Sequence, residues 1–308
     1  MLLASAVSQS TKSLLVRRWS AVSGSVDDCK AAKYLAASMS RRSGRAAKAD
    51  TFWGVPFPDD LYAFALFAKQ HPTALEALDL VPTGPLQFLL GGDLEEARYY
   101  NDPPEFVTTL GGLMDGLHWG YWFDAPGELD PIVVSYYAND AFELSDEGPT
   151  LFAAVRKHLN ALVRDATDNL TDDPDDADAY RQRLKGYAKV RKVLPVRRKR
   201  SRRKVVASTR NKLGIVVPKK QYQPLEKKDS FERWNYEPTE AQVKKFVASA
   251  KLPGTALKLG HDLWIFPKFR EQSIALLERA YAALGRKVLS AQLEKAIAWR
   301  ATCDARKK

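Results

Sequence analysis

Few residues in this sequence could carry acid–base chemistry, and they are scattered. The four histidines, His71, His118, His158 and His261, stand outside any nucleophile or zinc-binding motif. Nucleophile-elbow, phosphate-loop and dinucleotide-binding motifs are missing as well. A catalytic base needs an orienting partner, so a histidine beside a tryptophan or an aspartate is more often structural. The best-placed lone carboxylate is Glu105, which follows two prolines.

Glu105 belongs to the stretch NDPPEF at 101–106, which is followed by the aromatic run LHWGYWFDAPGE at 117–128. Proline fixes the backbone φ angle and pushes the preceding residue into an extended conformation. The two stretches therefore predict a rigid turn, an aromatic strand and a second turn. Burial of the aromatics as core is one interpretation, and presentation of a carboxylate at the turn is the other.

Two charged runs could bind ions or phosphates. Residues 165–178 hold seven aspartates, but the glycine and terminal glutamate of a calcium loop are missing, so a solvated linker is expected and no metal site. Residues 196–204 (VRRKRSRRK) could neutralise phosphates, act as an import signal if the cell has a nucleus, or form a solvated linker. The phosphate-binding candidates are Arg197, Arg198, Lys199, Arg200, Arg202 and Arg203.

The totals point to a globular protein with a basic surface. With 308 residues the chain can form one large domain or two, and its net charge of +11 favours nucleic acid or an acidic protein as partner. Cys29 and Cys303 lie near opposite ends, which suits a reducing compartment. No run approaches the ~20 apolar residues of a membrane span. Cytoplasmic localisation is predicted, or nuclear if the source is eukaryotic.

Local patterns predict alternating helices and strands in the first half. Residues 1–50 read as a basic, disordered or mobile segment, a targeting peptide or an extended start, with one short helix at 31–39. A helix from Asp59 should end at Pro72, a second short helix should cover 75–80, and Gly84-Pro85 should break the chain. Strands are predicted at 132–137 and 141–144, and a helix at 150–163.

The second half of the chain is also expected to contain both helices and strands. A helix at 179–193, two strands around a turn at 210–212, and helices at 239–251, 269–284 and 286–300 are expected. The fold class is therefore α+β, with a mixed or antiparallel sheet flanked by helices, two sheet-and-helix halves and a C-terminal helical pair. The predicted divisions are 1–50, 51–164, a charged linker and helix at 165–204, and 205–308.

Seven segments, in this order and spacing, resemble the histone PARylation factor family. They are residues 61–64, 84–92, 102–106, 120–126, 150–155, 213–218 and 257–263, so the resemblance covers about residues 51–300. It implies an accessory protein that docks onto the ADP-ribosyltransferase domain of a polymerase. There it lends a glutamate that deprotonates a serine, which then attacks NAD.

The positions that the resemblance assigns to catalysis are changed here. The family's Asp-Glu pair lies just before a Gly-x-x-Leu-x-Leu-Gly-x-Asp-Leu stretch, and the corresponding residues are Ser249 and Ala250. The family's arginine after a tyrosine is Gln223 in this chain. A shifted register could recruit Glu237 or Glu240 instead. With this exception no catalytic residue is predicted.

Three hypotheses follow. The first is a non-catalytic partner that binds, modulates or blocks an ADP-ribosyltransferase or NAD-consuming toxin, as an immunity protein would. The second is an active accessory factor with a carboxylate from elsewhere, and the third is a nucleic-acid-associated scaffold. No cofactor is expected on this chain, since NAD is used by the partner, and the composition suggests a bacterial source. The predicted partner-binding residues are Gln223, Ser249, His261 and Asp262.

Overall fold

The computed structural model describes residues 44–113, 115–137, 143–169, 174–196, 203–225 and 237–306. Within them the chain is α+β, as predicted. It divides into two compact units, each assembled from separate stretches of sequence. The helical unit comprises Met1–Lys48, Phe57–Asp79 and Thr150–Lys199, and the sheet unit comprises Ala49–Pro56, Leu80–Pro149 and Arg200–Lys308. The division between the units falls inside helix α3 (Arg45–Trp53), between Lys48 and Ala49. The predicted helix at 31–39 lies outside the described residues.

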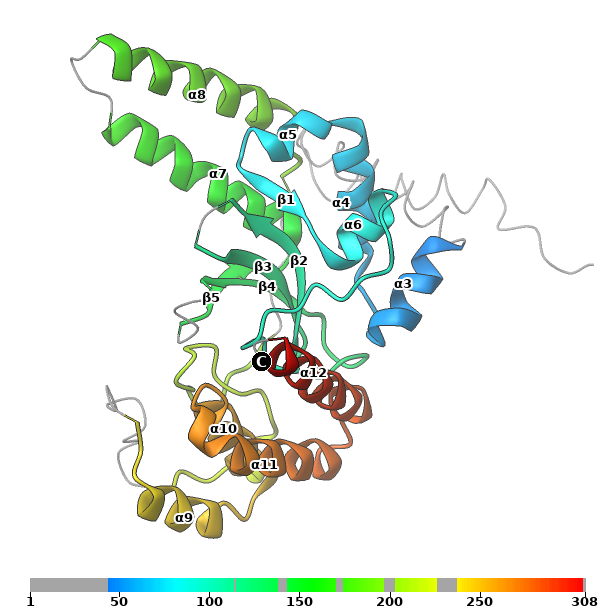
Figure 1. Cartoon of the computed structure of the whole chain (residues 1–308), viewed down its shortest axis with the longest axis vertical. Helices are drawn as coiled ribbons and strands as arrows, with labels where there is room; N and C mark the ends of the chain where they lie inside the picture. The colour runs from blue at the N-terminus through cyan, green and yellow to red at the C-terminus, as the bar shows by residue number, and fades with distance from the viewer. Residues whose placement is uncertain are drawn as a thin grey trace, which may run out of the picture. The chain divides into compact units, whose positions relative to one another are not determined.

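The helical unit is built from α4 (Asp59–Gln70), α5 (Pro72–Glu76), α7 (Leu151–Asp168) and α8 (Pro174–Val193). Helices α7 and α8 lie side by side (Figure 1). The Thr150 hydroxyl caps α7 by accepting a hydrogen bond from the Ala153 amide. The buried carboxylate of Asp60 accepts from the Leu151 amide at 2.6 Å, so α4 fixes the first turn of α7.

The predicted acidic linker is largely helical. Helix α7 continues to Asp168 and α8 begins at Pro174, so both ends of the 165–178 segment belong to helices. Proline tolerates the first turn of a helix, and aspartates there favour the positive end of the helix dipole. The composition of residues 165–178 suggested a linker, because composition takes no account of whether a proline or an aspartate stands in the first turn of a helix.

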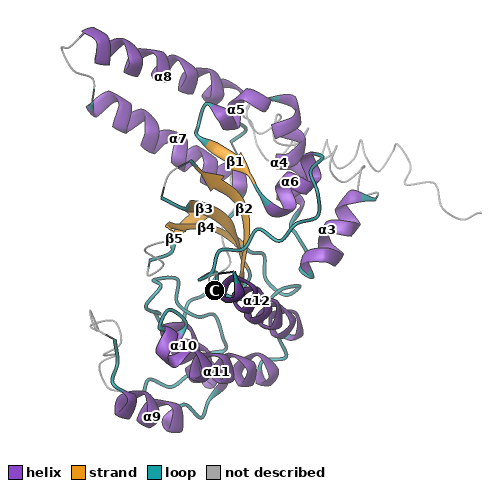
Figure 2. Ribbon diagram, in the orientation of Figure 1, coloured by secondary structure: helices purple, strands orange, loops and turns teal. Residues whose placement is uncertain are grey.

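The sheet unit holds one five-stranded antiparallel sheet in the order β1-β2-β3-β4-β5 (Figure 2). Its strands are β1 (Leu80–Pro82), β2 (Phe106–Gly112), β3 (Leu117–Trp122), β4 (Ile132–Tyr137) and β5 (Ser145–Gly148). The predicted strand at 132–137 is confirmed. Of the strand predicted at 141–144, residues 141 and 142 lie outside the described residues, and the returning strand β5 begins only at Ser145, after the buried Leu144.

Gly84-Pro85 starts a helix, α6 (Gly84–Leu90), where the sequence predicted only a break. Gly84 has a φ of +48°, and an added Cβ would lie 2.7 Å from the Thr108 carbonyl oxygen, so only glycine fits. The second short helix is likewise shifted, since α5 ends at Glu76 and Leu80 begins β1.

The C-terminal part of the sheet unit is helical. It contains α9 (Glu240–Ser249), α10 (Pro253–Leu263), α11 (Arg270–Ala283), α12 (Lys287–Ala305) and the short 3-10 turns η1 (Lys219–Gln221) and η3 (Pro267–Phe269). The predicted C-terminal pair is confirmed, split at Gly285 with a φ of +69°. The strands expected on either side of 210–212 are reduced to one bridge between Ala207 and Ile215.

Helix α10 is buried along its length and packs on α11. Gly260 makes this possible, because a Cβ there would lie 2.8 Å from the Leu277 side chain. No helix in the described residues is long and apolar enough to span a membrane. The same residues contain no cluster of ligands that could hold a metal ion.

Candidate partner-binding site

The two positions assigned to the base pair lie where α9 ends and the chain turns into α10. Ser249 is exposed, and its hydroxyl donates to the Lys245 carbonyl oxygen at 3.0 Å. Ala250 is fully buried, and its carbonyl oxygen accepts from the Arg279 guanidinium. Neither side chain can take a proton from a substrate hydroxyl at neutral pH.

Gln223 is positioned by the first turn of α10. The Thr255 hydroxyl accepts a hydrogen bond from the backbone N–H of Gln223 at 3.0 Å and donates one to the backbone carbonyl oxygen of Gln223 at 2.8 Å. The backbone approaches closely beside it, since a Cβ on Gly254 would lie 2.7 Å from the Gln221 carbonyl oxygen. The start of α10 therefore contacts the segment that holds Gln223, and Ser249 lies four residues before the first residue of this helix. We call residues 221–223 and 249–252, of which Gln223, Ser249 and Lys251 are exposed, the α10 face.

Under the α10 face lies a buried ion pair. Lys258 Nζ is 2.8 Å from Asp262 Oδ2, and Asp262 Oδ1 accepts from the Arg210 amide at 2.7 Å. Burial raises the pKa of Asp262, and Lys258 offsets only part of this effect. The prediction that Asp262 binds a partner is corrected, because its carboxylate is enclosed and bound within the fold.

His261 is also an interior residue, which corrects the second of these predictions. Its Nε2 lies 3.0 Å from Glu105 Oε1, and that same oxygen accepts from the Tyr281 hydroxyl. Burial raises the pKa of Glu105, but the His261 ring and the Tyr281 hydroxyl together hold it below its usual range. Glu105 thus ties the DPPEF turn to α10 and α11, and the interpretation of this turn as core is the correct one.

A second cluster of the same kind surrounds Asp102. Asp102 Oδ1 lies 3.1 Å from His118 Nε2 and accepts from the Tyr136 hydroxyl, while Oδ2 accepts from the Thr108 hydroxyl at 3.0 Å. Burial raises the pKa of Asp102, but the His118 ring, the Arg98 guanidinium and the Tyr136 hydroxyl hold it below its usual value. His118 is fully buried, so the structural interpretation of this residue is confirmed.

The two glutamates considered as displaced bases lie at the other end of α9. Glu240 is exposed and lies 3.0 Å from Lys268 Nζ, and Glu237 is exposed just before the helix. At 1.5 Å per residue, Glu240 is roughly 13 Å along the helix axis from Ser249. A shift of register by one or two residues cannot bridge that separation.

The basic run is described only at its end. Arg197, Arg198, Lys199, Arg200 and Arg202 lie outside the described residues. Arg203 makes a bidentate ion pair with Asp124, at 2.6 and 3.0 Å, and donates to the Leu213 and Gly214 carbonyl oxygens. The prediction that Arg203 contacts phosphate is therefore corrected: this guanidinium holds two segments of the sheet unit together.

Sequence reasoning missed the residues that position the site. Tyr281, Thr255 and Arg279 contact Glu105, Gln223 and Ala250, and each partner is distant in sequence. A tyrosine or threonine inside a helix has no local feature that identifies such a partner. Only the capping box at Thr239, which starts α9, was readable from neighbouring residues.

Fold and site together define an α+β protein with clusters of buried titratable side chains around Asp102, Glu105 and Asp262, and with a candidate surface for another protein. The chain belongs to the histone PARylation factor family: the family model described as Histone PARylation factor 1 matches residues 48–234. The match includes Gln223 but ends before α9, so positions 249 and 250 lie outside it.

Curated relatives agree with this assignment. The chain is 29% identical over 191 residues to Histone PARylation factor 1 of Bos taurus, covering 55% of each chain. It is 26% identical over 191 residues to the Mus musculus protein, again 55% of each, and 31% identical over 129 residues to the Danio rerio protein, 39% of this chain and 36% of that one. The chain thus spans about half the length of the curated relatives it matches.

Proposed function

We propose that this chain binds the catalytic domain of an ADP-ribosyltransferase and modulates it without supplying a catalytic base. The proposal rests on family membership and on one observation: the α10 face is fixed by Thr255 and Gly254, yet positions 249 and 250 carry a hydroxyl and a methyl group. On this proposal NAD is used by the partner, and the role given to this chain needs no cofactor of its own.

The consequence for the chemistry is direct. A serine hydroxyl is a weak nucleophile at neutral pH and needs a carboxylate within hydrogen-bonding distance to accept its proton. A protein that covers the transferase cleft without such a carboxylate occupies the space of the acceptor and leaves it unactivated. The expected result is blocking, which is the action of an immunity protein if the transferase is a toxin.

The test is to add purified chain to a transferase catalytic domain, NAD and a serine-containing acceptor peptide. We expect modification of the peptide to fall as the chain approaches equimolar amounts. Ser249→Glu should relieve this block and yield serine modification, because it places a carboxylate on the α10 face. Gln182→Glu adds the same charge at an exposed position of α8, outside the residues that make up the α10 face, and should leave the block unchanged. Failure of the wild-type chain to bind or inhibit would remove the proposal.

The second candidate is an active accessory factor that directs modification to serine. The observation that favours it is the exposed carboxylate of Glu240, which lies beside Lys268 at the opposite end of α9 from Ser249 and would act from there without any shift of register. If the wild-type chain promotes serine modification and Glu237→Gln with Glu240→Gln abolishes it, this alternative replaces the first. Unchanged acceptor choice in the double variant removes the alternative.

A further inference from the structure

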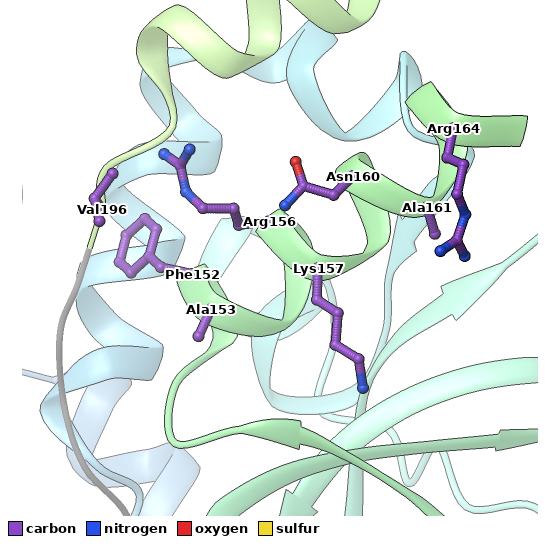
Figure 3. A pocket seen from close by; sticks show the side chains of 8 residues that line it. All are labelled: Phe152, Ala153, Arg156, Lys157, Asn160, Ala161, Arg164 and Val196. Atoms are coloured by element: carbon purple, nitrogen blue, oxygen red, sulfur yellow. The ribbon is translucent and has the colours of Figure 1, made fainter. Parts of the chain in front are cut away.

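A basic groove lies on the helical unit. It has a volume of about 490 Å³ and is lined mainly by one helix, α7, with Val196 at one end. Its principal lining residues are Phe152, Arg156, Lys157, Asn160, Arg164 and Val196 (Figure 3). Among the described residues that line it there are three cations and no carboxylate. We call this feature the α7 groove.

The cations are held at helical spacing. Lys157 and Arg164 are both exposed and are seven residues apart, which puts them on the same side of α7, two turns or roughly 10 Å apart. Figure 3 shows their side chains extending toward the same side of the helix. The Arg156 guanidinium donates to the Leu194 carbonyl oxygen, and this contact holds the segment after α8 against the groove.

Helix α8 adds positive charge next to the groove. Arg191 donates to the Asn160 side-chain oxygen at 2.9 Å, so its guanidinium lies at the groove's edge. The described exposed cations of α8 are Arg181, Arg183, Lys185, Lys189, Arg191 and Lys192. Along the sequence, the aspartates of residues 165–178 follow Arg164 at the end of α7 and precede the cations of α8.

We propose that the α7 groove binds the phosphate backbone of double-stranded nucleic acid. Arginine, lysine and asparagine side chains are the usual partners of phosphate oxygens, and such contacts carry no base information. A single strand is the weaker fit, because stacking needs exposed aromatic rings and the one aromatic that lines the groove, Phe152, is 1% exposed. The basic run at 197–204 follows Val196 directly in sequence.

The experiment measures binding of the full chain to a short, fluorescently labelled DNA duplex as a function of salt concentration. Each phosphate contact contributes about 0.9 to the slope of log K against log salt, so Lys157→Gln with Arg164→Gln should reduce the slope by about 2 and the affinity about tenfold or more. Lys69→Gln with Lys287→Gln removes the same charge from exposed positions outside the groove and should have a much smaller effect.

The outcomes distinguish binding at the α7 groove from attraction by the overall positive charge of the chain. Equal losses in the two double variants overturn the proposal, since net charge alone then accounts for binding. A wild-type chain that does not bind the duplex, or that binds a single strand more tightly, overturns it too. Thermal unfolding of both double variants should match the wild type, because all four side chains are exposed. No transferase is present in this assay, so its result is independent of the function proposed above.

Discussion

The interior around the DPPEF turn and the exposed α10 face differ in how they use titratable groups. In the interior, Asp102 and Glu105 are each bound by a histidine and a tyrosine and are almost completely buried. At the α10 face, where the resemblance places proton transfer, the corresponding side chains are Ser249 and Ala250. Both of these histidine-paired carboxylates are therefore buried, whereas neither corresponding position at the α10 face carries a carboxylate.

This difference teaches that a carboxylate next to a histidine is not by itself evidence of catalysis. A buried ion pair contributes little net stability, but loss of one partner is costly because the other charge stays buried. Such pairs therefore fix the geometry of the DPPEF turn relative to α10 and α11. The exposed side chains of the α10 face can be substituted without loss of the fold. The following predictions test this difference between the buried pairs and the α10 face.

The largest expected effect is at Asp102. Asp102→Ala leaves His118, Tyr136 and Thr108 without their shared acceptor, and we expect a loss of about 3–5 kcal/mol in the free energy of unfolding, measured with urea. Asp178→Ala, at an exposed carboxylate on α8, should change stability by less than about 0.5 kcal/mol. Similar small losses in both variants would contradict the structural role assigned to the cluster.

Glu105→Gln should be milder. The amide oxygen can still accept from the Tyr281 hydroxyl, but the negative charge facing His261 is lost, so we expect a loss of about 1–3 kcal/mol. Tyr281→Phe and the double variant complete a thermodynamic cycle. An effect in the double variant equal to the sum of the singles would show that these two groups are not coupled.

Stability should also fall in acid. The pKa values of Asp102 and Glu105 are lowered in the folded protein, so their contribution is present above the unfolded values of about 4 and is lost as the pH falls through the lower folded values. The raised pKa of Asp262 gives a contribution of opposite sign. Urea unfolding at a series of pH values should show a smaller acid loss in Glu105→Gln than in the wild type.

The smallest effect is expected at the α10 face itself. Ser249→Ala removes an exposed hydroxyl whose hydrogen bond is to its own helix, so stability should change by less than about 0.5 kcal/mol. Inhibition of the transferase should be unchanged as well, because the hydroxyl has no role as a base. A large change in either quantity would place Ser249 in the site's chemistry and remove the contrast with the interior.

Several elements were predictable because their causes are local. The β-branched run that forms β4, the periodicity of α7 and the hydroxyl caps at Thr150 and Thr239 are all set by neighbouring residues. Composition gave wrong predictions where the position of a residue within a helix matters. Residues at the end of α7 and the start of α8 were predicted as a linker, and Gly84, where α6 begins, was predicted as a break.

By itself, the sequence determined the α+β class, the C-terminal helical pair and the family resemblance, and it predicted that the family's acidic pair is replaced at 249–250. Only the tertiary structure decided that Glu105, His261 and Asp262 are interior residues, that Arg203 is paired with Asp124, and that Gln223 is tied to α10. Periodicity and capping depend on contacts within a few residues. The partners of a buried charge can come from distant segments, as with Glu105 and Tyr281, which are 176 residues apart, and no local pattern encodes them.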